Sequence, residues 1–300
     1  MKRALYGILL SLLISTELFA QSGTSNKEAI FIFNYRVNRL FSIPTSRIYR
    51  SLDFGITVGS NFNDSGIENF SGSFGFGLFN LVEFQIISNP VDYTNFKRRQ
   101  NNLELSAKLK LMSEKPFWPG ISIGGTTNIA QLRTRLNESR LKLENEKGYN
   151  LGLRSIDYNI RINKFYLVMS KRLFSTVNLH LGINLNQLNF NNINTKYNFG
   201  KDNYSVNNLR KSVIEYFGGI DFVLNGRTKF LLEIFSGPLL DLDVSNGNIL
   251  LKQKTIVNAG MRTFINGWFV VEYGLHFDDQ YSNLENIQLR VGLTAFWNIY

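Results

Sequence analysis

Most of this 300-residue chain consists of segments in which apolar and polar residues alternate. In residues 51–59, the apolar positions are Leu52, Phe54, Ile56 and Val58, and small or polar residues separate them. Successive side chains of an extended strand point to opposite faces, so this segment has one apolar face and one polar face. The wall of a membrane barrel, with hydrocarbon outside and a polar interior, requires that pattern.

The alternating segments are numerous enough to close a barrel. They predict about twelve strands of a length that crosses a membrane at a tilt. The predicted ranges are 46–62, 68–79, 81–89, 102–112, 120–130, 158–171, 176–188, 213–224, 227–236, 254–265, 268–277 and 287–300.

The connections between these segments alternate between short and long. Asn225-Gly226 and Asn266-Gly267 are the dipeptide preferred in two-residue type I′ hairpins, whereas residues 131–157 and 189–212 form much longer connections. If the first strand starts in the periplasm, every short turn lies on that side and every longer loop lies outside. The sequence therefore predicts an all-β fold: a transmembrane antiparallel up-and-down β-barrel of about twelve strands, with short periplasmic turns and longer extracellular loops.

The N-terminal residues have the organisation of a secretory signal. Lys2 and Arg3 form a basic start, an apolar run follows, and Ala20 is the expected last residue before cleavage. An uncleaved anchor is the alternative, although the apolar run is shorter than the ~20 residues that span a bilayer. We therefore predict a signal peptide at 1–20, a periplasmic lead-in at 21–45 and the barrel at 46–300.

Composition excludes several other classes of protein. The chain has no cysteine, which excludes disulfides and thiolate metal sites. After the signal, no apolar run is long enough for a transmembrane helix. The formal net charge of +10 fits contact with outer-membrane lipid and the phosphates of lipopolysaccharide, and no nucleic acid partner is expected for an exported protein. Residues 131–147 form either a short amphipathic helix that caps the pore or contacts lipopolysaccharide phosphates, or a solvated loop, and Lys97-Arg98-Arg99 also fits contact with lipopolysaccharide.

Charged side chains fall on the polar face of the predicted strands, where they would line the interior of the barrel. A charge on the lipid face would cost ~2–4 kcal/mol near the midplane, which explains this sorting. These inward charged side chains have two interpretations: they form a charged lining that selects solutes, or a network of ion pairs that fills a narrow interior. Inward glycines are compatible with a small pore, and they are Gly75, Gly77, Gly124, Gly219 and Gly260. The lumen-lining candidates are Asp53, Glu83, Glu104, Lys108, Lys110, His180, Glu215, Asp221, Lys229, Glu233, Arg262, Glu272, His276 and Arg290.

His180 and His276 are the two histidines of the chain. A zinc site would need further ligands at a suitable spacing, and none accompanies them in the sequence. Outer-membrane phospholipases use a Ser-His pair on the lipid-facing surface, whereas both histidines here alternate to the inside. Asp278 and Asp279 either join loop oxygens in a calcium site or are solvated. We therefore expect no catalytic residue, no metal site and no cofactor.

Six short motifs carry a resemblance to a known family. They are Ile43-Pro44-Thr45-Ser46-Arg47-Ile48 opening the first strand, residues 76–84 around a tight turn, residues 119–125, Ser170-Lys171-Arg172, residues 217–222 and residues 258–262. Most of the mature chain is covered, and these motifs resemble the YjbH-like outer-membrane barrels associated with exopolysaccharide production. The resemblance implies export or surface deposition of polysaccharide, with polysaccharide-export proteins as partners and no assigned catalytic residue. The aromatic-ended segment 289–300 also resembles the signal recognised by the barrel-assembly machinery.

Together these patterns predict an integral outer-membrane barrel that acts as a passive channel or export component. One alternative is a phospholipase-like hydrolase, and the other is a structural or adhesion barrel with a plugged lumen. Conductance in planar bilayers separates the channel from the plugged barrel, and phospholipid hydrolysis would identify the enzyme.

Overall fold

The computed structural model describes residues 38–63, 66–91, 100–129, 132–136, 153–197, 204–243, 248–279 and 287–299. Within this part of the chain every regular element is a β-strand, and no helix is long and apolar enough to cross a bilayer. The strands are β1 (Asp53–Asn63), β2 (Gly66–Leu78), β3 (Val82–Val91), β4 (Gln100–Met112), β5 (Gly120–Asn128), β6 (Leu132–Leu136), β7 (Leu153–Arg172), β8 (Val177–Tyr197), β9 (Tyr204–Val223), β10 (Thr228–Asp243), β11 (Asn248–Phe264), β12 (Phe269–Asp278) and β13 (Gln288–Asn298).

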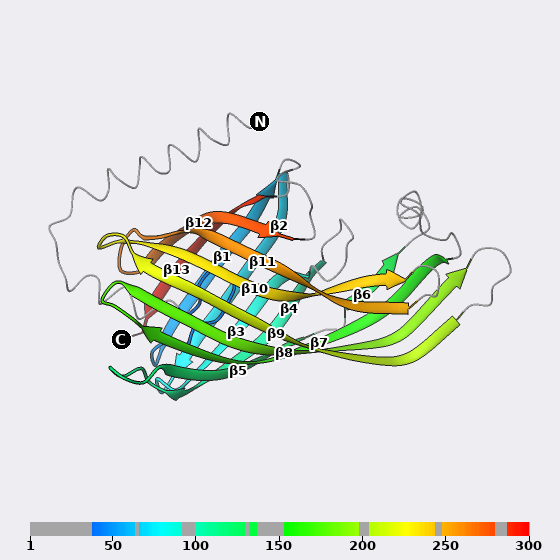
Figure 1. Cartoon of the computed structure of the whole chain (residues 1–300), viewed down its shortest axis with the longest axis horizontal. Coiled ribbons are helices and arrows are strands. Elements are labelled where there is room, and N and C mark those ends of the chain that lie inside the picture. Colours follow the sequence, from blue (N-terminus) through cyan, green and yellow to red (C-terminus); the bar gives the residue numbers. More distant parts are fainter. Residues whose placement is uncertain are drawn as a thin grey trace.

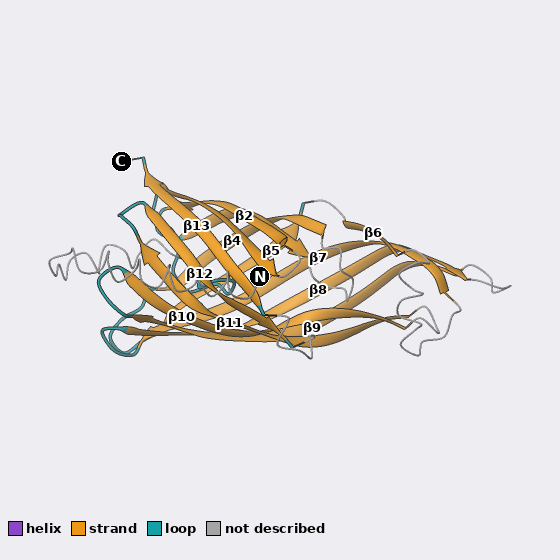
Figure 2. Cartoon of the chain, turned by 90° about the horizontal axis from the view of Figure 1, so that it is seen from above, coloured by secondary structure: helices purple, strands orange, loops and turns teal. Residues whose placement is uncertain are grey.

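The strands form one antiparallel sheet that closes on itself (Figure 1, Figure 2). Consecutive strands pair from β1 to β5 and from β6 to β13, and the closing pairs are β1 with β13 and β5 with β7. The short β6 continues the line of β5, because β5 pairs with residues 163–170 of β7 and β6 pairs with residues 156–160. β5 and β6 therefore share one position in a closed 12-strand barrel, which confirms the predicted fold class.

The two faces of the wall carry the residues that the alternation assigned to them. On β8, Leu181 and Ile183 are about half exposed on the outside, whereas His180 and Asn186 are buried. β4 and β10 show the same separation of exposed apolar and buried polar side chains. The outward residues form an apolar band that suits contact with hydrocarbon.

Short turns close one end of the barrel, which we call the short-turn end, and both predicted Asn-Gly turns differ from their prediction. Asn266 lacks the positive φ of a type I′ turn, and its side chain accepts the N–H groups of Trp268 at 3.0 Å and Phe269 at 2.7 Å. At the predicted type I′ turn around Asn225, neither Asn225 nor Gly226 has the positive φ that this turn requires. Instead the Asn225 side chain accepts hydrogen bonds from the N–H groups of Arg227 at 2.9 Å and Thr228 at 2.8 Å, so the side chain itself closes a wider turn. Phe79 and Asn80, both with φ of 55°, have the backbone of a type I′ turn.

Strands β7 to β11 continue past the rest of the barrel at the opposite end (Figure 1). The predicted loops 131–157 and 189–212 are therefore shorter than expected, because β8 runs on to Tyr197 and β9 starts at Tyr204. In this extension the buried inward residues are apolar, as Leu188 and Phe190 show, while polar residues such as Asn189 alternate to the other face. In the extension the apolar residues point inward instead of outward. A prediction based on one continuous lipid-facing apolar face therefore ends these strands too early.

Candidate functional site

Residues 38–50, which we call the plug, lie inside the barrel and not in its wall. The plug contains a small hairpin, in which the N–H of Thr45 donates to Asn38 O at 3.0 Å and that of Leu40 to Ile43 O at 3.0 Å. Leu40, Phe41 and Ile43 at its tip are each at most 3% exposed. The structure differs here from the predicted periplasmic lead-in, 21–45, and from the predicted first strand, 46–62, because β1 begins only at Asp53. Residues 21–37 lie outside the described residues.

Charged side chains of the wall hold the backbone of the plug tip. The Glu233 carboxylate on β10 accepts the N–H of Ser42 at 3.0 Å and that of Ile43 at 3.2 Å. The guanidinium of Arg262 on β11 donates to Leu40 O at 2.8 Å. Arg290 on β13 donates to the carbonyl of Phe41 at 2.9 Å. Among the described residues the hairpin has no strand partner in the wall, so these side chains satisfy backbone groups that would otherwise be buried without hydrogen bonds.

The second half of the plug is anchored nearer the short-turn end. The N–H of Ser46 donates to Ser170 Oγ at 2.8 Å, and Ser122 Oγ donates to Ser46 O at 2.7 Å. The N–H of Tyr49 donates to Glu83 Oε2 at 2.9 Å. The plug therefore contacts inward residues on several sides of the barrel.

Inward glycines make room for the plug. A Cβ on Gly75 would stand 2.7 Å from the Tyr49 ring, and one on Gly260 would stand 2.9 Å from Phe41. A Cβ on Gly219 would meet Leu40. The inward glycine pattern is compatible with a small pore, but plug side chains occupy the space beside these three glycines. Gly124 differs, since the Tyr166 ring of the wall covers it.

Replacing Gly77 by alanine should weaken docking of the plug. The new Cβ would lie 2.5 Å from Tyr49 O and closer still to Arg50 O, and backbone atoms cannot turn aside as a flexible side chain can. We expect a loss of about 1–3 kcal/mol, the usual cost of overpacking, measured by denaturant unfolding from detergent micelles. Gly226→Ala is the matched control, because no atom lies within 4 Å of its added Cβ. Equal effects of the two substitutions would contradict this account.

Apolar residues on the inner wall complete the seat of the plug. Val168, Phe217 and Leu231 form one buried cluster with the plug tip. Phe264, Val270 and Phe296 form another with Tyr49. Sequence reasoning missed these positions, although they leave a readable signal: each is an apolar residue on an otherwise polar strand face.

The predicted lumen-lining residues lie on the inner face, where many of them pair with one another. Ion pairs join Lys108 to Glu83 at 3.3 Å, Lys229 to Asp221 at 3.1 Å and Arg262 to Glu272 at 2.6 Å. Lys110, His276 and Arg290 are half-buried. The buried members are Asp53, Glu83, Glu104, Lys108, His180, Glu215, Asp221, Lys229, Glu233, Arg262 and Glu272.

Ser170, His180 and Asp221 form a hydrogen-bonded row under the plug. His180 Nδ1 lies 2.8 Å from Ser170 Oγ, and Nε2 lies 2.9 Å from Asp221 Oδ2. The ionised carboxylate of Asp221 can only accept, so Nε2–H of His180 donates to it, and Nδ1 of the neutral ring then accepts the proton of the Ser170 hydroxyl. These are the residue types of a hydrolase triad, but the row is buried and faces the interior instead of the lipid. Its evident task is to hold Ser46.

His276 and the acidic pair at 278–279 have other partners. His276 Nδ1 lies 2.7 Å from Asn258 Oδ1, and Asp278 pairs with Lys254 at 2.7 Å. The N–H of Asp279 donates to Thr255 O at 3.1 Å. Among the described residues, no three His, Cys, Asp or Glu side chains are grouped so that they could hold a metal ion.

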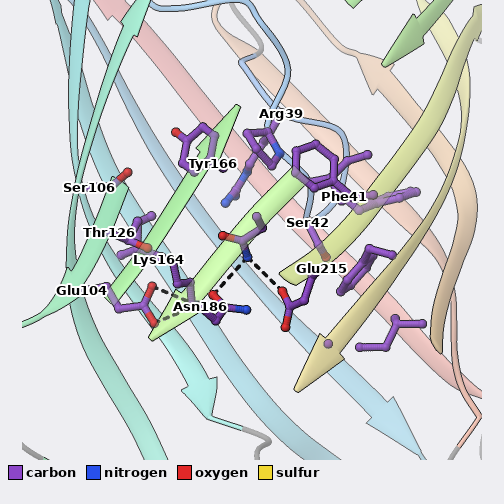
Figure 3. Close-up of a pocket in the computed structure, with 18 of the residues that line it drawn as sticks. Arg39, Phe41, Ser42, Glu104, Ser106, Thr126, Lys164, Tyr166, Asn186 and Glu215 are labelled. Carbon is purple, nitrogen blue, oxygen red and sulfur yellow. Dashed lines mark hydrogen bonds and ion pairs between the residues drawn. The ribbon is translucent and has the colours of Figure 1, made fainter. Parts of the chain in front are cut away.

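A cavity of about 380 Å³, lined by both polar and apolar side chains, lies beyond the plug tip (Figure 3). Arg39, Phe41 and Ser42 of the plug form its floor. Its wall comes from many strands and includes Glu83, Gln85, Glu104, Ser106, Lys108, Thr126, Lys164, Tyr166, Asn184, Asn186, Glu215, Lys254, His276, Asp278 and Arg290. This volume lies in the range of small-molecule sites. Polar side chains and a few aromatic rings offer hydrogen bonds and flat apolar contacts to a small solute.

In comparisons with known proteins, this chain resembles solved structures of membrane barrels. The sequence matches no protein-family model, and no curated protein matches it. The CymD monoaromatic hydrocarbon channel has 10% sequence identity and a TM-score of 0.44, with 85% of this chain and 90% of that chain covered. The NanC porin has 11% identity and a TM-score of 0.47, covering 81% and 99%. The translocator domain of the autotransporter NalP from Neisseria meningitidis has 8% identity and a TM-score of 0.45, covering 81% and 86%. None of these three likenesses carries an argument about function.

Proposed function

We propose that this chain is an integral outer-membrane β-barrel that lets small polar solutes cross through its lumen when the plug moves aside. The observation that carries the proposal is the division of the lumen into two parts. One part is the plug, and the other is a cavity directly behind it whose lining includes many charged and polar side chains. A barrel that served only as a rigid body would not need such a cavity in its interior.

The attachment of the plug supports movement. Its tip has no strand partner in the wall, and its backbone is held by side chains such as Glu233, Arg262 and Arg290. Such contacts can be released without breaking the hydrogen-bond ladders that close the barrel. The wall would therefore keep its shape while the lumen opens.

A permanently plugged structural or adhesion barrel is the second candidate. Buried ion pairs and two apolar clusters around the plug favour it, because they fill much of the lumen. This candidate predicts that no condition opens a path for ions. An experiment that locks the plug in the lumen and then releases it distinguishes the channel from the structural barrel.

Polysaccharide export is the finer version of the proposal. It rests on the resemblance to the YjbH-like barrels, in which the segment 43–48 would open the first strand. Here that segment belongs to the plug. The identity of the transported molecule is therefore a separate question from whether solutes cross the lumen.

A disulfide that locks the plug tests the proposed function. The chain has no cysteine, and Ser46 Oγ lies 2.7 Å from where a Cβ of residue 120 would stand, which is within reach of a disulfide. The variant Ser46→Cys with Gly120→Cys should show no single-channel conductance in planar bilayers when oxidised. Reduction should restore the channel openings of the wild-type protein.

The single variants Ser46→Cys and Gly120→Cys are the controls. Neither can form this disulfide, so the reductant should not change their conductance. Equal conductance of the double variant before and after reduction would show that ions do not need the plug to move. A wild-type protein that inserts correctly but never conducts would favour the structural barrel.

A further inference from the structure

One wall of the cavity carries two polar residues on neighbouring strands. Asn184 on β8 and Glu215 on β9 are register partners. The amide nitrogen of Asn184 donates to Glu215 Oε2 at 2.9 Å and to Asn186 Oδ1 at 3.1 Å. Figure 3 shows Asn186 and Glu215 close together, and the amide nitrogen of Asn184 donates a hydrogen bond to each of them. The two donor hydrogens of Asn184 are therefore used inside the protein.

The remaining oxygens of this pair have no partner. Glu215 Oε1 and Asn184 Oδ1 are both buried and without a hydrogen bond in the described structure. A buried acceptor left unsatisfied costs free energy, and a carboxylate costs more than an amide. The pair therefore calls for a group that donates hydrogen bonds.

Glu215 also differs from the other buried carboxylates of the lumen. Glu83, Glu104, Asp221, Glu272 and Asp278 each have an ion pair at 3.3 Å or less. Glu233 accepts several N–H groups. Lys164, which also lines the cavity, is bonded to Glu104. Within the described residues Glu215 alone among these carboxylates has a buried oxygen without a hydrogen-bond partner.

We propose that the cavity binds small solutes through a primary ammonium group, held by Glu215 and Asn184. An ammonium has three donors and a positive charge, so it satisfies both free oxygens and neutralises the carboxylate. A neutral hydroxyl has one donor and leaves the charge uncompensated. A metal ion would need further ligands, and the described residues do not group them here. This inference rests on the proposed function and names the solute class that it would admit.

Equilibrium binding to the full barrel in detergent tests the inference without requiring passage. Isothermal titration at neutral pH compares two matched pairs of probes: glucosamine with N-acetylglucosamine, and ethanolamine with ethylene glycol. In each pair the ammonium compound should bind at least about tenfold more tightly than its neutral partner. Glu215→Gln should reduce the affinity for the ammonium probes by about ten- to a hundredfold, the usual effect of losing one charge-assisted hydrogen bond.

The control variant removes one buried carboxylate of the inner wall that does not line the cavity. Asp53→Asn changes the charge by the same amount as Glu215→Gln and should keep the preference for ammonium. Absence of that preference in both probe pairs would overturn the inference, leaving water as the partner of the free oxygens. Amine binding by a barrel that never conducts would overturn the proposed function alone. Conductance without amine preference would overturn this inference alone.

Discussion

Replacing Glu233 by alanine should release the tip of the plug. The carboxylate is fully buried and accepts hydrogen bonds from Ser42 N, Ile43 N and the amide of Asn258. Its loss leaves these donors without an acceptor in the interior. Each buried donor left without an acceptor costs about 1–3 kcal/mol, and two of these donors belong to the plug, so the population with an undocked plug should rise by roughly one to four orders of magnitude.

Two measurements check this expectation. Hydrogen exchange should speed up at the amides of Ser42 and Ile43, and openings in planar bilayers should become more frequent. Glu233→Gln, which keeps one acceptor oxygen, should lie between the wild type and Glu233→Ala. Glu104→Gln is the control, since the Glu104 carboxylate pairs with Lys164 and accepts the side-chain amide of Asn102, both of which belong to the wall. Unchanged exchange at Ser42 and Ile43 in Glu233→Ala would show that other contacts hold the tip.

The largest effect on the wall itself is expected from Leu181→Arg. Leu181 lies on the outer face of β8, midway along its apolar stretch, and is 45% exposed. If the barrel spans a membrane, an arginine there places a charge in hydrocarbon and costs about 2–4 kcal/mol. Yield of heat-modifiable, folded barrel and stability against denaturant in lipid vesicles should both fall.

Asn184→Arg provides the matched comparison on the same strand. This side chain points to the cavity beside Glu215, so an arginine meets a carboxylate there instead of lipid. The cost should be far smaller than for Leu181→Arg. Equal destabilisation by the two substitutions would contradict the membrane-facing assignment of this wall.

The sequence by itself determined the wall of the barrel. Period-2 alternation follows directly from strand geometry, and the cost of a charge in hydrocarbon acts on each residue separately. Leu181 and His180 could therefore be assigned to opposite faces without knowledge of any neighbour. The same local rule located the short turns, although at Asn225 it missed how the side chain reaches the backbone of Thr228.

Only the tertiary structure decided what fills the lumen. The plug is a short irregular segment without periodicity, and its partners are far away in the sequence: Ser42 binds Glu233, and Tyr49 binds Glu83. Single-sequence patterns carry no information about such distant pairs. Inward glycines such as Gly219 are equally ambiguous, because an empty pore and a docked leucine both require the absence of a side chain. Barrel closure brings the plug against the inward glycines and places the unpaired oxygen of Glu215 beside the cavity, and that arrangement follows from packing in three dimensions.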